Sequence, residues 1–185
     1  MLRAAIGRWQ AKLLFCSVLC SWVWGLRGEG LEAIIHTVKQ VLLEEEDEDK
    51  MLLQIVLISA FNEADRQAAF KEVEEHFPEI LRWVLTCYSH QARLLFGDIV
   101  ILSEAGFHQS DPLAFLLLAL ALDPIVRTIA ERIPDLLVHV WYLDDGSMVG
   151  SNEQLRQAVD TVQELGPPRG FTCPLPSLLC GVAVL

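Results

Sequence analysis

Two adjacent aspartates, Asp144 and Asp145, stand in the segment Trp141–Gly146, whose Asp-Gly ending is typical of a β-hairpin turn. Two like charges this close repel each other unless a cation lies between them. Mg²⁺ prefers carboxylate oxygens, so the pair is a candidate site for a divalent cation and for the phosphoryl transfer that such ions support. An ordinary Asp-Gly turn with a spare acid is the alternative, and the pair alone does not exclude it.

Two further segments precede this turn. Residues 60–66 (AFNEADR) follow an apolar run at Leu52–Ile58, and residues 106–113 (GFHQSDPL) precede a long apolar stretch. In this order and spacing, the three segments resemble the palm of reverse transcriptases from non-long-terminal-repeat retroelements. The motifs of that family typically read DxxNAFNxxDR, GxxQGDPL and YxDDG. The resemblance extends from about residue 30 to residue 171, and the ordered trio is far more specific than the acidic pair alone.

The resemblance implies RNA-templated DNA synthesis, in which two Mg²⁺ ions roughly 4 Å apart activate a primer hydroxyl and stabilise the leaving pyrophosphate. It assigns Asp144 and Asp145 as catalytic metal ligands, with an RNA template, a primer and a deoxynucleoside triphosphate (dNTP) as partners. Phe61 matches the aromatic residue that blocks the ribose 2′-hydroxyl, and Gln109 matches a residue near the incoming nucleotide. We expect the acidic pair to lie beside the strand that ends just before residue 60.

The sequence departs from the family pattern at one metal ligand. Five residues before Phe61, where the pattern has aspartate, stands Val56, which has no oxygen to offer an ion. Ser110 replaces a glycine and Ser59 replaces an asparagine, while a basic fingers segment and a thumb are not evident. We therefore expect a degenerate or truncated copy whose polymerase activity is absent or severely impaired. The alternative is a non-enzymatic interaction or scaffold protein that retains the palm fold.

The composition limits the partners. The chain has 185 residues, with 14 Lys and Arg against 25 Asp and Glu, a formal net charge of −11 and a hydrophobic fraction of 52%. These values fit one globular domain, and the negative charge predicts weak binding to nucleic acid if any. Five scattered cysteines without a CxxC pair indicate reduced thiols, and five dispersed histidines lack metal-ligand spacing and are expected to be structural.

The elements that must position the candidate residues follow from apolar periodicity and capping signals. Strands are predicted at Leu52–Ile58, Leu137–Leu143 and Ser147–Val149, with turns at Gly97-Asp98 inside a hairpin over Ala92–Leu102 and at residues 144–146. Helices are predicted over Glu32–Leu43, Glu63–His76, Ile80–Tyr88, Asp111–Arg132 and Ser151–Leu165, with Trp83 and Trp141 in the core. This order favours an α+β fold, an antiparallel sheet with helices packed on one face, as in a reverse-transcriptase-like palm without complete fingers and thumb.

The chain divides by composition into three parts. Residues 1–29 are an apolar leader in which three basic residues precede the run Leu13–Leu26. That shape is typical of a secretory signal, although Trp22 and Trp24 occupy the place of a cleavage site; an intracellular location is favoured, and a secreted protein is the alternative. The run is shorter than the about 20 residues of a membrane span, and no span is expected. Residues 30–166 are the palm, and residues 167–185 are a Pro-rich tail with no predictable element.

Overall fold

The structure is a computed structural model, and it describes residues 30–44, 50–173 and 177–179. The leader at residues 1–29 lies outside the described residues. The helices are α3 (Gly30–Glu44), α4 (Ala60–Glu63), α5 (Arg66–His76), α6 (Pro78–Tyr88), α7 (Pro112–Arg132), α8 (Asn152–Leu165) and the short 3-10 helix η1 (Pro167–Arg169). The strands are β1 (Met51–Val56), β2 (Ala92–Phe96), β3 (Ile99–Ser103), β4 (Val138–Tyr142), β5 (Asp145–Gly150) and β6 (Ser177–Leu179).

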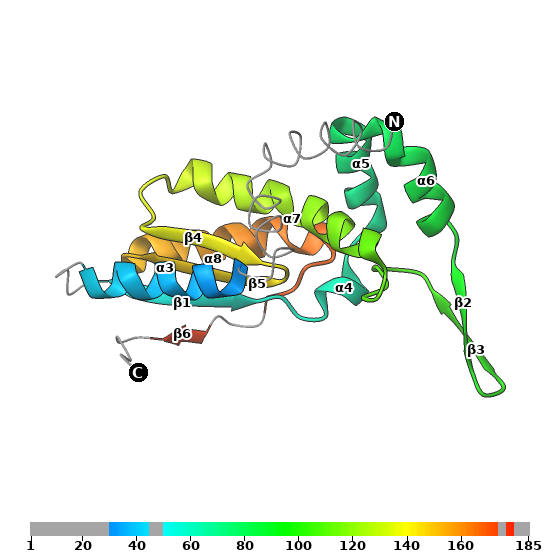
Figure 1. Cartoon of the computed structure of the whole chain (residues 1–185), viewed down its shortest axis with the longest axis horizontal. Helices are drawn as coiled ribbons and strands as arrows, with labels where there is room; N and C mark the ends of the chain where they lie inside the picture. The colour runs from blue at the N-terminus through cyan, green and yellow to red at the C-terminus, as the bar shows by residue number, and fades with distance from the viewer. Residues whose placement is uncertain (1–29, 45–49, 174–176, 180–185) are drawn as a thin grey trace.

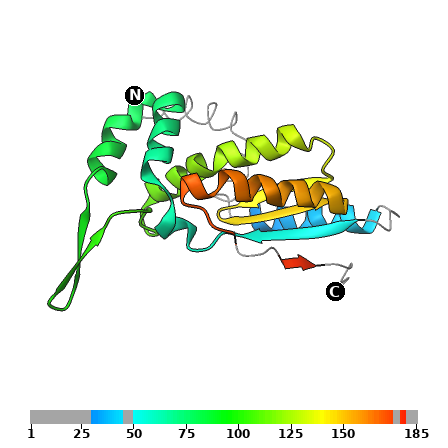
Figure 2. The same ribbon diagram turned by 180° about the vertical axis from the view of Figure 1, so that it is seen from behind.

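The main sheet has the strand order β4-β5-β1-β6, and each neighbouring pair is antiparallel. Helices α7 and α8 cover one face of this sheet, and α3 lies over the opposite face (Figures 1 and 2). The core lies between the sheet and α7, because Leu53 and Ile55 of β1 point to the same side as the buried residues of α7. The predicted α+β architecture is confirmed, and α3 adds a helix on the second face.

Helix α7 is 21 residues long and is apolar enough, by length and composition, to cross a membrane. Its apolar side chains, including Leu117, Leu120 and Ile129, are buried against the rest of the protein. Asp111 caps its first turn, since the Leu113 amide donates to Asp111 Oδ1 at 2.9 Å. The predicted start at Asp111-Pro112 is confirmed, and the helix continues through Pro124.

The prediction that both tryptophans belong to the core is half right. Trp141 of β4 is 2% exposed, whereas Trp83 of α6 is 56% exposed. Helix α6 buries Val84 and Tyr88, which are four residues apart and share one stripe. Trp83 lies about 100° around the helix from Val84, and it therefore faces away from the core.

No element was predicted beyond Gly166, but the structure contains two there. Phe171 is buried after η1, and an isolated antiparallel bridge joins Thr172 to Ile58. Strand β6 then pairs with β1, so residues far apart in the chain meet at this edge of the sheet. Prolines flank these residues and interrupt the apolar periodicity from which helices and strands are predicted. Of the cysteines in the described part of the chain, Cys87 is an exposed free thiol and Cys173 is half-buried; the other three lie outside it.

Strands β2 and β3 form a separate two-stranded hairpin that extends away from the body of the molecule (Figure 1). Its turn is at Gly97-Asp98, as predicted, and Gly97 has the positive φ of 59° that this position requires.

Candidate functional site

The acidic pair lies at the tip of the hairpin formed by β4 and β5. The turn residues are Leu143 and Asp144, and Asp145 is already the first residue of β5. The predicted turn at residues 144–146 is therefore wrong by one residue, since Gly146 pairs with Trp141 inside the ladder. Leu143 has a φ of 59°, a left-handed conformation that is costly for a residue with a branched side chain. Such strained residues are concentrated at functional sites.

The strand that ends before residue 60 lies directly beside this acidic pair. In the β1–β5 register, Val56 is opposite Asp145, and in the β4–β5 register Asp145 is opposite Tyr142. The Leu57 amide also donates to the Asp144 carbonyl oxygen at 3.1 Å. Directly paired residues in a sheet point to the same face, so these side chains form one row across three strands. The expected meeting of the acidic pair with position 56 is confirmed.

A cavity of about 360 Å³ lies over this row, between α3 and the sheet. Its floor combines the row of Val56, Asp145 and Tyr142 with the next row along the sheet, and Ile35 of α3 also lines it. Partial burial, and then the neighbouring charge of Asp144, raise the pKa of Asp145 above its usual range. The cavity therefore contains a carboxyl group that gives up its proton less readily than a free aspartate does.

The row supplies one carboxylate, Asp145, with Asp144 in the adjoining turn, and it does not supply the ligands of a two-ion centre. A cation would relieve the repulsion between Asp144 and Asp145. A second ion needs a further carboxylate to share, and the residue opposite Asp145 is Val56, which is 56% exposed and purely aliphatic. The other polar side chains that line the cavity, Gln54, Tyr142 and Ser147, carry no charge.

The first and second sequence motifs pack directly against each other. The Gly106 amide donates to the Ala64 carbonyl at 3.0 Å, and the Phe107 amide donates to the Phe61 carbonyl. Gly106 has a φ of 67°, and a Cβ there would lie 2.3 Å from the carbonyl oxygens of Phe61 and Asn62. Only glycine fits at this contact, so the glycine that opens the second motif has a structural reason.

Gln109 and Ser110 form an exposed turn immediately before α7. The contacts of Gly106 with the first motif anchor this loop, and Gln109 lies on the surface of the molecule. The Asp111 amide donates to the His108 carbonyl at 2.9 Å and closes the turn. Ser110, which replaces the glycine of the family motif, is exposed. A nucleotide contact of Gln109 stays a prediction.

Phe61 has a different environment from that expected of a nucleotide contact. It is 6% exposed, packs edge-to-face on Phe115 of α7 with ring centres 5.4 Å apart, and does not line the cavity beside Asp145. The structure therefore gives Phe61 a packing role, and its contact with a sugar stays a prediction. Just before it, Ser59 has a φ of 48° at the start of α4. Asparagine tolerates this left-handed conformation better than serine does, which explains the family preference at this position.

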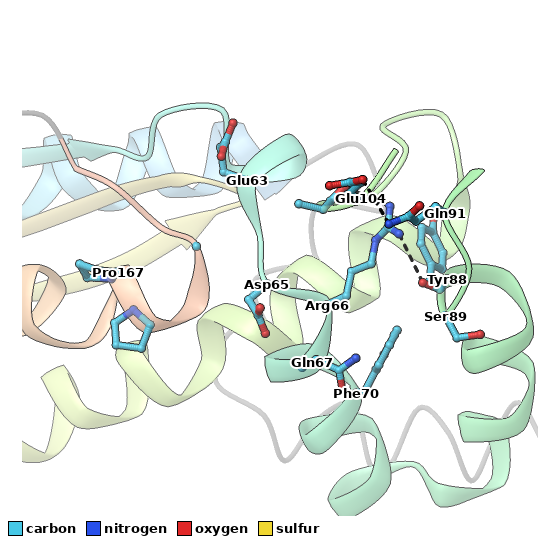
Figure 3. Close-up of a pocket in the computed structure, with 13 residues that line it drawn as sticks. Glu63, Asp65, Arg66, Gln67, Phe70, Tyr88, Ser89, Gln91, Glu104 and Pro167 are labelled. Atoms are coloured by element: carbon cyan, nitrogen blue, oxygen red, sulfur yellow. Dashed lines mark hydrogen bonds between the residues drawn. The ribbon is translucent and has the colours of Figure 1, made fainter. Parts of the chain in front are cut away.

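Sequence reasoning missed the network that joins the hairpin base to α5, α6 and α7 (Figure 3). Arg66 donates to the Gly106 carbonyl at 2.8 Å, to the Tyr88 carbonyl at 3.4 Å, and to Ser103 Oγ and the Ala105 carbonyl at 3.0 Å each. The neighbouring Asp65 makes only a local contact, because it caps α5 by accepting from the Ala68 amide at 2.7 Å, whereas Arg66 acts over long range.

Tyr88 completes this network. Its hydroxyl donates to Asp111 Oδ2 at 2.5 Å, its ring packs edge-to-face on Phe107, and the Arg66 guanidinium lies 5.7 Å from the ring centre. Burial and the bond to Asp111 raise the pKa of Tyr88 well above its usual range, so the hydroxyl stays a donor. The aromatic residue at the end of an amphipathic helix could have indicated a buried anchor, but nothing in the sequence indicated its partner. A second cavity, of about 370 Å³, adjoins this network and is lined by Arg66, Tyr88 and acidic groups such as Glu104 (Figure 3).

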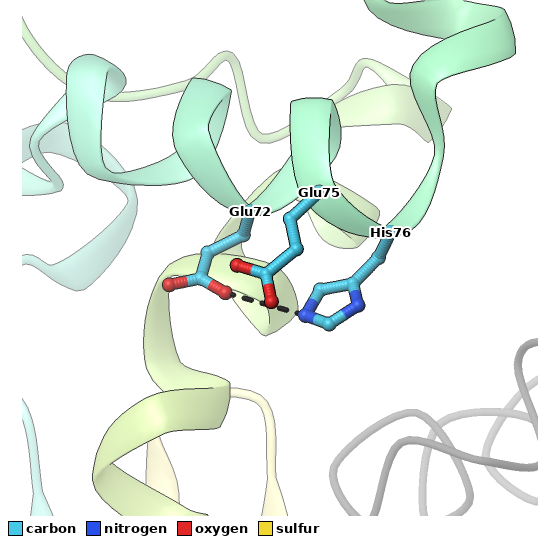
Figure 4. Close-up of side chains that lie close together, drawn as sticks. All are labelled: Glu72, Glu75 and His76. Atoms are coloured by element: carbon cyan, nitrogen blue, oxygen red, sulfur yellow. Dashed lines mark ion pairs between the residues drawn. The ribbon is translucent and has the colours of Figure 1, made fainter.

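Glu72, Glu75 and His76 of α5 bring three possible metal-ligand atoms within 4.8 Å of one another (Figure 4). Glu72 is also 3.2 Å from Arg169 and 3.8 Å from Arg127, while His76 Nε2 is 3.6 Å from Glu72. Two guanidinium groups already compensate this buried carboxylate. The cluster links α5 to α7 and η1, which fits the structural role expected for the histidine.

Comparison with solved structures shows the fold. Telomerase from Candida tropicalis bound to a fragment of telomeric RNA superposes with a TM-score of 0.61 at 11% identity, over 85% of this chain. The apo telomerase of that species, truncated from its C-terminal domain, gives a TM-score of 0.62 at 12% identity over 84%. Telomerase from Candida albicans, also with telomeric RNA, gives 0.52 at 10% identity over 80%. The chain has a reverse-transcriptase-like fold.

At these identities the likeness defines the fold alone, and this reverse-transcriptase-like chain covers only 30%, 35% and 30% of the three telomerase chains. No protein-family model and no curated protein matched the sequence. The non-long-terminal-repeat lineage, the metal and the roles of Asp144, Asp145, Phe61 and Gln109 therefore stay predictions.

Proposed function

We propose that this chain is a reverse-transcriptase-like domain of retroelement type in which nucleotidyl transfer is severely impaired. The observation that carries this proposal is the register of β1 and β5, in which Val56 lies opposite Asp145. The resemblance places a metal-binding aspartate at that point of the row, and valine supplies no carboxylate.

The proposal gives each residue of the site a role. Asp144 and Asp145 would hold one divalent cation, whose chemistry is to neutralise phosphate oxygens in the transition state. Gln109, on the exposed turn before α7, would contact the nucleotide. With Val56 in the row, the activation of a primer hydroxyl has no shared ligand to support it.

The proposed partners are an RNA template with its primer and a dNTP, bound weakly. The telomerases with this fold include forms solved with telomeric RNA, which supports an RNA partner for a domain of the same architecture. The net charge of −11 opposes binding to a phosphate backbone. Binding would therefore depend on local contacts of Lys and Arg with phosphates, which weaken as salt is added, so it should be measured at low ionic strength.

Primer extension on an RNA template, with Mg²⁺ or Mn²⁺, tests the proposal. We expect no dNTP incorporation by the wild-type chain and detectable, metal-dependent incorporation by Val56→Asp. Val56→Asn is the matched control and should stay inactive, because asparagine has nearly the same shape as aspartate but no charge. Clear incorporation by the wild-type chain that Asp145→Asn abolishes would show that the site works without a carboxylate at position 56 and would refute the impairment.

A non-enzymatic interaction protein is the second candidate function, and one observation favours it. The β2–β3 hairpin exposes seven large apolar side chains, which is more than a monomeric catalyst requires. Filter binding with RNA and with an RNA–DNA hybrid at low salt separates the two functions. Retained affinity that falls with added salt supports the polymerase-derived function, and no affinity in a stably folded chain supports the interaction function.

A further inference from the structure

The β2–β3 hairpin is an apolar arm without a core of its own. It extends from the body in both views of the molecule (Figures 1 and 2). Seven of its large apolar side chains are 44–77% exposed: Leu94, Leu95, Phe96, Ile99, Val100, Ile101 and Leu102. In the described part of the chain, β2 and β3 pair only with each other. Both outer edges of this small sheet therefore have unpaired backbone groups.

Such an arm is poorly suited to stand alone in water. An isolated two-stranded hairpin is marginally stable, and a third strand or a packed face is needed for stability. Here the pairing Leu94↔Ile101 puts apolar groups on one face, and the pairing Leu95↔Val100 puts apolar groups on the other. Strands that are apolar on both faces are typical of sheets buried on both sides. The hairpin therefore has the apolar pattern of a buried sheet, and its open strand edges can pair with a strand of another chain.

We propose that the hairpin joins two copies of this chain into a symmetric dimer by antiparallel pairing of their β2 edges. A two-fold axis places the base of one hairpin beside the tip of the other. The base of β2 carries Arg93 and the tip carries Asp98, and both are exposed. Pairing Leu95 with Leu95 of the second copy puts each Arg93 opposite Gly97, next to Asp98 of the other copy. The arrangement therefore forms two reciprocal attractive charge pairs.

The corresponding pairing of the other edge is less favourable. Two β3 strands centred on Ile101 would place the base residue Glu104 of each copy opposite Asp98 of the other. Those two contacts are between like charges, which are destabilising when directly opposite. Charge complementarity thus selects β2 over β3 and selects a second copy, because the matching charges are on the hairpin itself.

The large negative charge of each chain does not prevent this contact. The strands have five residues each, which at about 3.4 Å per residue makes the arm about 17 Å long. Overlapped arms keep the two bodies apart by about this length, twice the Debye length of about 8 Å at physiological ionic strength. Strands β2 and β3 themselves carry one positive charge, with one negative charge at the turn between them.

Sedimentation velocity of the full 185-residue chain tests the dimer. We expect concentration-dependent association from 20.8 kDa to twice that mass. Arg93→Asp or Asp98→Lys alone should raise the dimer Kd about tenfold, because two symmetry-related exposed pairs each contribute a few-fold. The double variant Arg93→Asp/Asp98→Lys should restore association. Leu95→Lys, which puts two like charges at the centre of the interface, should abolish it.

Leu137→Lys is the matched control, because Leu137 is also exposed and apolar but precedes β4, away from the hairpin. It should leave the dimer intact, and far-UV circular dichroism should show that every variant keeps its secondary structure. Three results would overturn the proposal: a monomer up to about 0.1 mM, where a micromolar Kd would be evident; an oligomer that Leu95→Lys does not affect; or a double variant that stays dissociated. None of these outcomes bears on polymerase chemistry, so this test is independent of the proposed function.

Discussion

Replacing Val56 with aspartate should destabilise the metal-free protein. Val56 lies opposite Asp145 on an open face of the sheet, so the new carboxylate would be about 5 Å from the existing one. Two unit charges at that distance repel by about 1 kcal/mol in water and about 3 kcal/mol at an effective dielectric constant of 20. Since Val56 is 56% exposed, we expect the free energy of unfolding to fall by an amount near the lower end of this range.

Urea denaturation at pH 7 in a chelating buffer measures this loss, and Val56→Asn separates charge from shape. The asparagine variant should lose much less stability, since it removes the same methyl groups without adding charge. The loss in Val56→Asp should also depend on pH. Burial and Asp144 already raise the pKa of Asp145, and a third carboxylate raises it further. A carboxyl group with a raised pKa in the native state is destabilising above that pKa, and the effect disappears as pH falls below the usual range of aspartate.

Adding Mn²⁺ or Mg²⁺ should restore the stability of Val56→Asp and leave Val56→Asn nearly unchanged, because a cation bound only by the native state stabilises it by RT ln(1 + [L]/Kd), where [L] is the free cation concentration. Two outcomes would refute the reasoning. Equal destabilisation by Asp and Asn would show that the carboxylates do not meet in the row. Repulsion without metal rescue would show that the row cannot hold a cation, and the assignment of Asp144 and Asp145 as ligands would be wrong.

Three further predictions concern the scaffold around the site. Gly106→Ala should lower the free energy of unfolding by about 3 kcal/mol or more, since a Cβ would lie 2.3 Å from two carbonyl oxygens. Gly97 has a similar φ but open space around it, so Gly97→Ala should lower the free energy of unfolding by only about 1 kcal/mol. Chemical denaturation of the two variants compares these losses. Tyr88→Phe removes the bond to Asp111 and should cost about 2 kcal/mol, with a matching drop in Tm by calorimetry. Burial lowers the pKa of His139 to about 4, so the unfolded chain binds its proton first as pH falls. Stability should therefore decline by about 2 kcal/mol between pH 6.5 and 4, and His139→Gln should remove this part of the decline.

Local signals in the sequence were sufficient for most helix boundaries. Ser151 and Gln154 form a capping box at the predicted start of α8, in which the Ser151 amide donates to Gln154 Oε1 at 2.8 Å. Asp111 begins α7 as its position before Pro112 indicated. These interactions lie within three or four residues of each other, so composition and spacing specify them. The shift of the β4–β5 turn to Leu143 was not predictable in the same way, because Asp-Gly is ordinarily the better turn and only pairing with β1 explains the choice.

The long-range part of the site depended on tertiary packing. That Val56 would lie beside the acidic pair was predicted from the resemblance, not from periodicity, and the register confirms it. The contacts of Arg66 connect residues 22 to 40 positions apart, and no local pattern indicates them. For Phe61, a motif match predicted a contact with the nucleotide sugar, whereas the contact in the structure is with Phe115 in the core.

The substitution at position 56 also explains how the fold can persist without a cation. A row with carboxylates at positions 56 and 145, and a third at 144 in the adjoining turn, would be under mutual repulsion whenever metal is absent. Valine removes one charge from the row and adds a β-branched side chain that suits a strand. The metal-free sheet is therefore more stable with Val56 than with aspartate, whereas the two-ion chemistry would require that third carboxylate. Under the proposed function, stability and catalysis make opposite demands on this one side chain, and the present sequence meets the demand for stability.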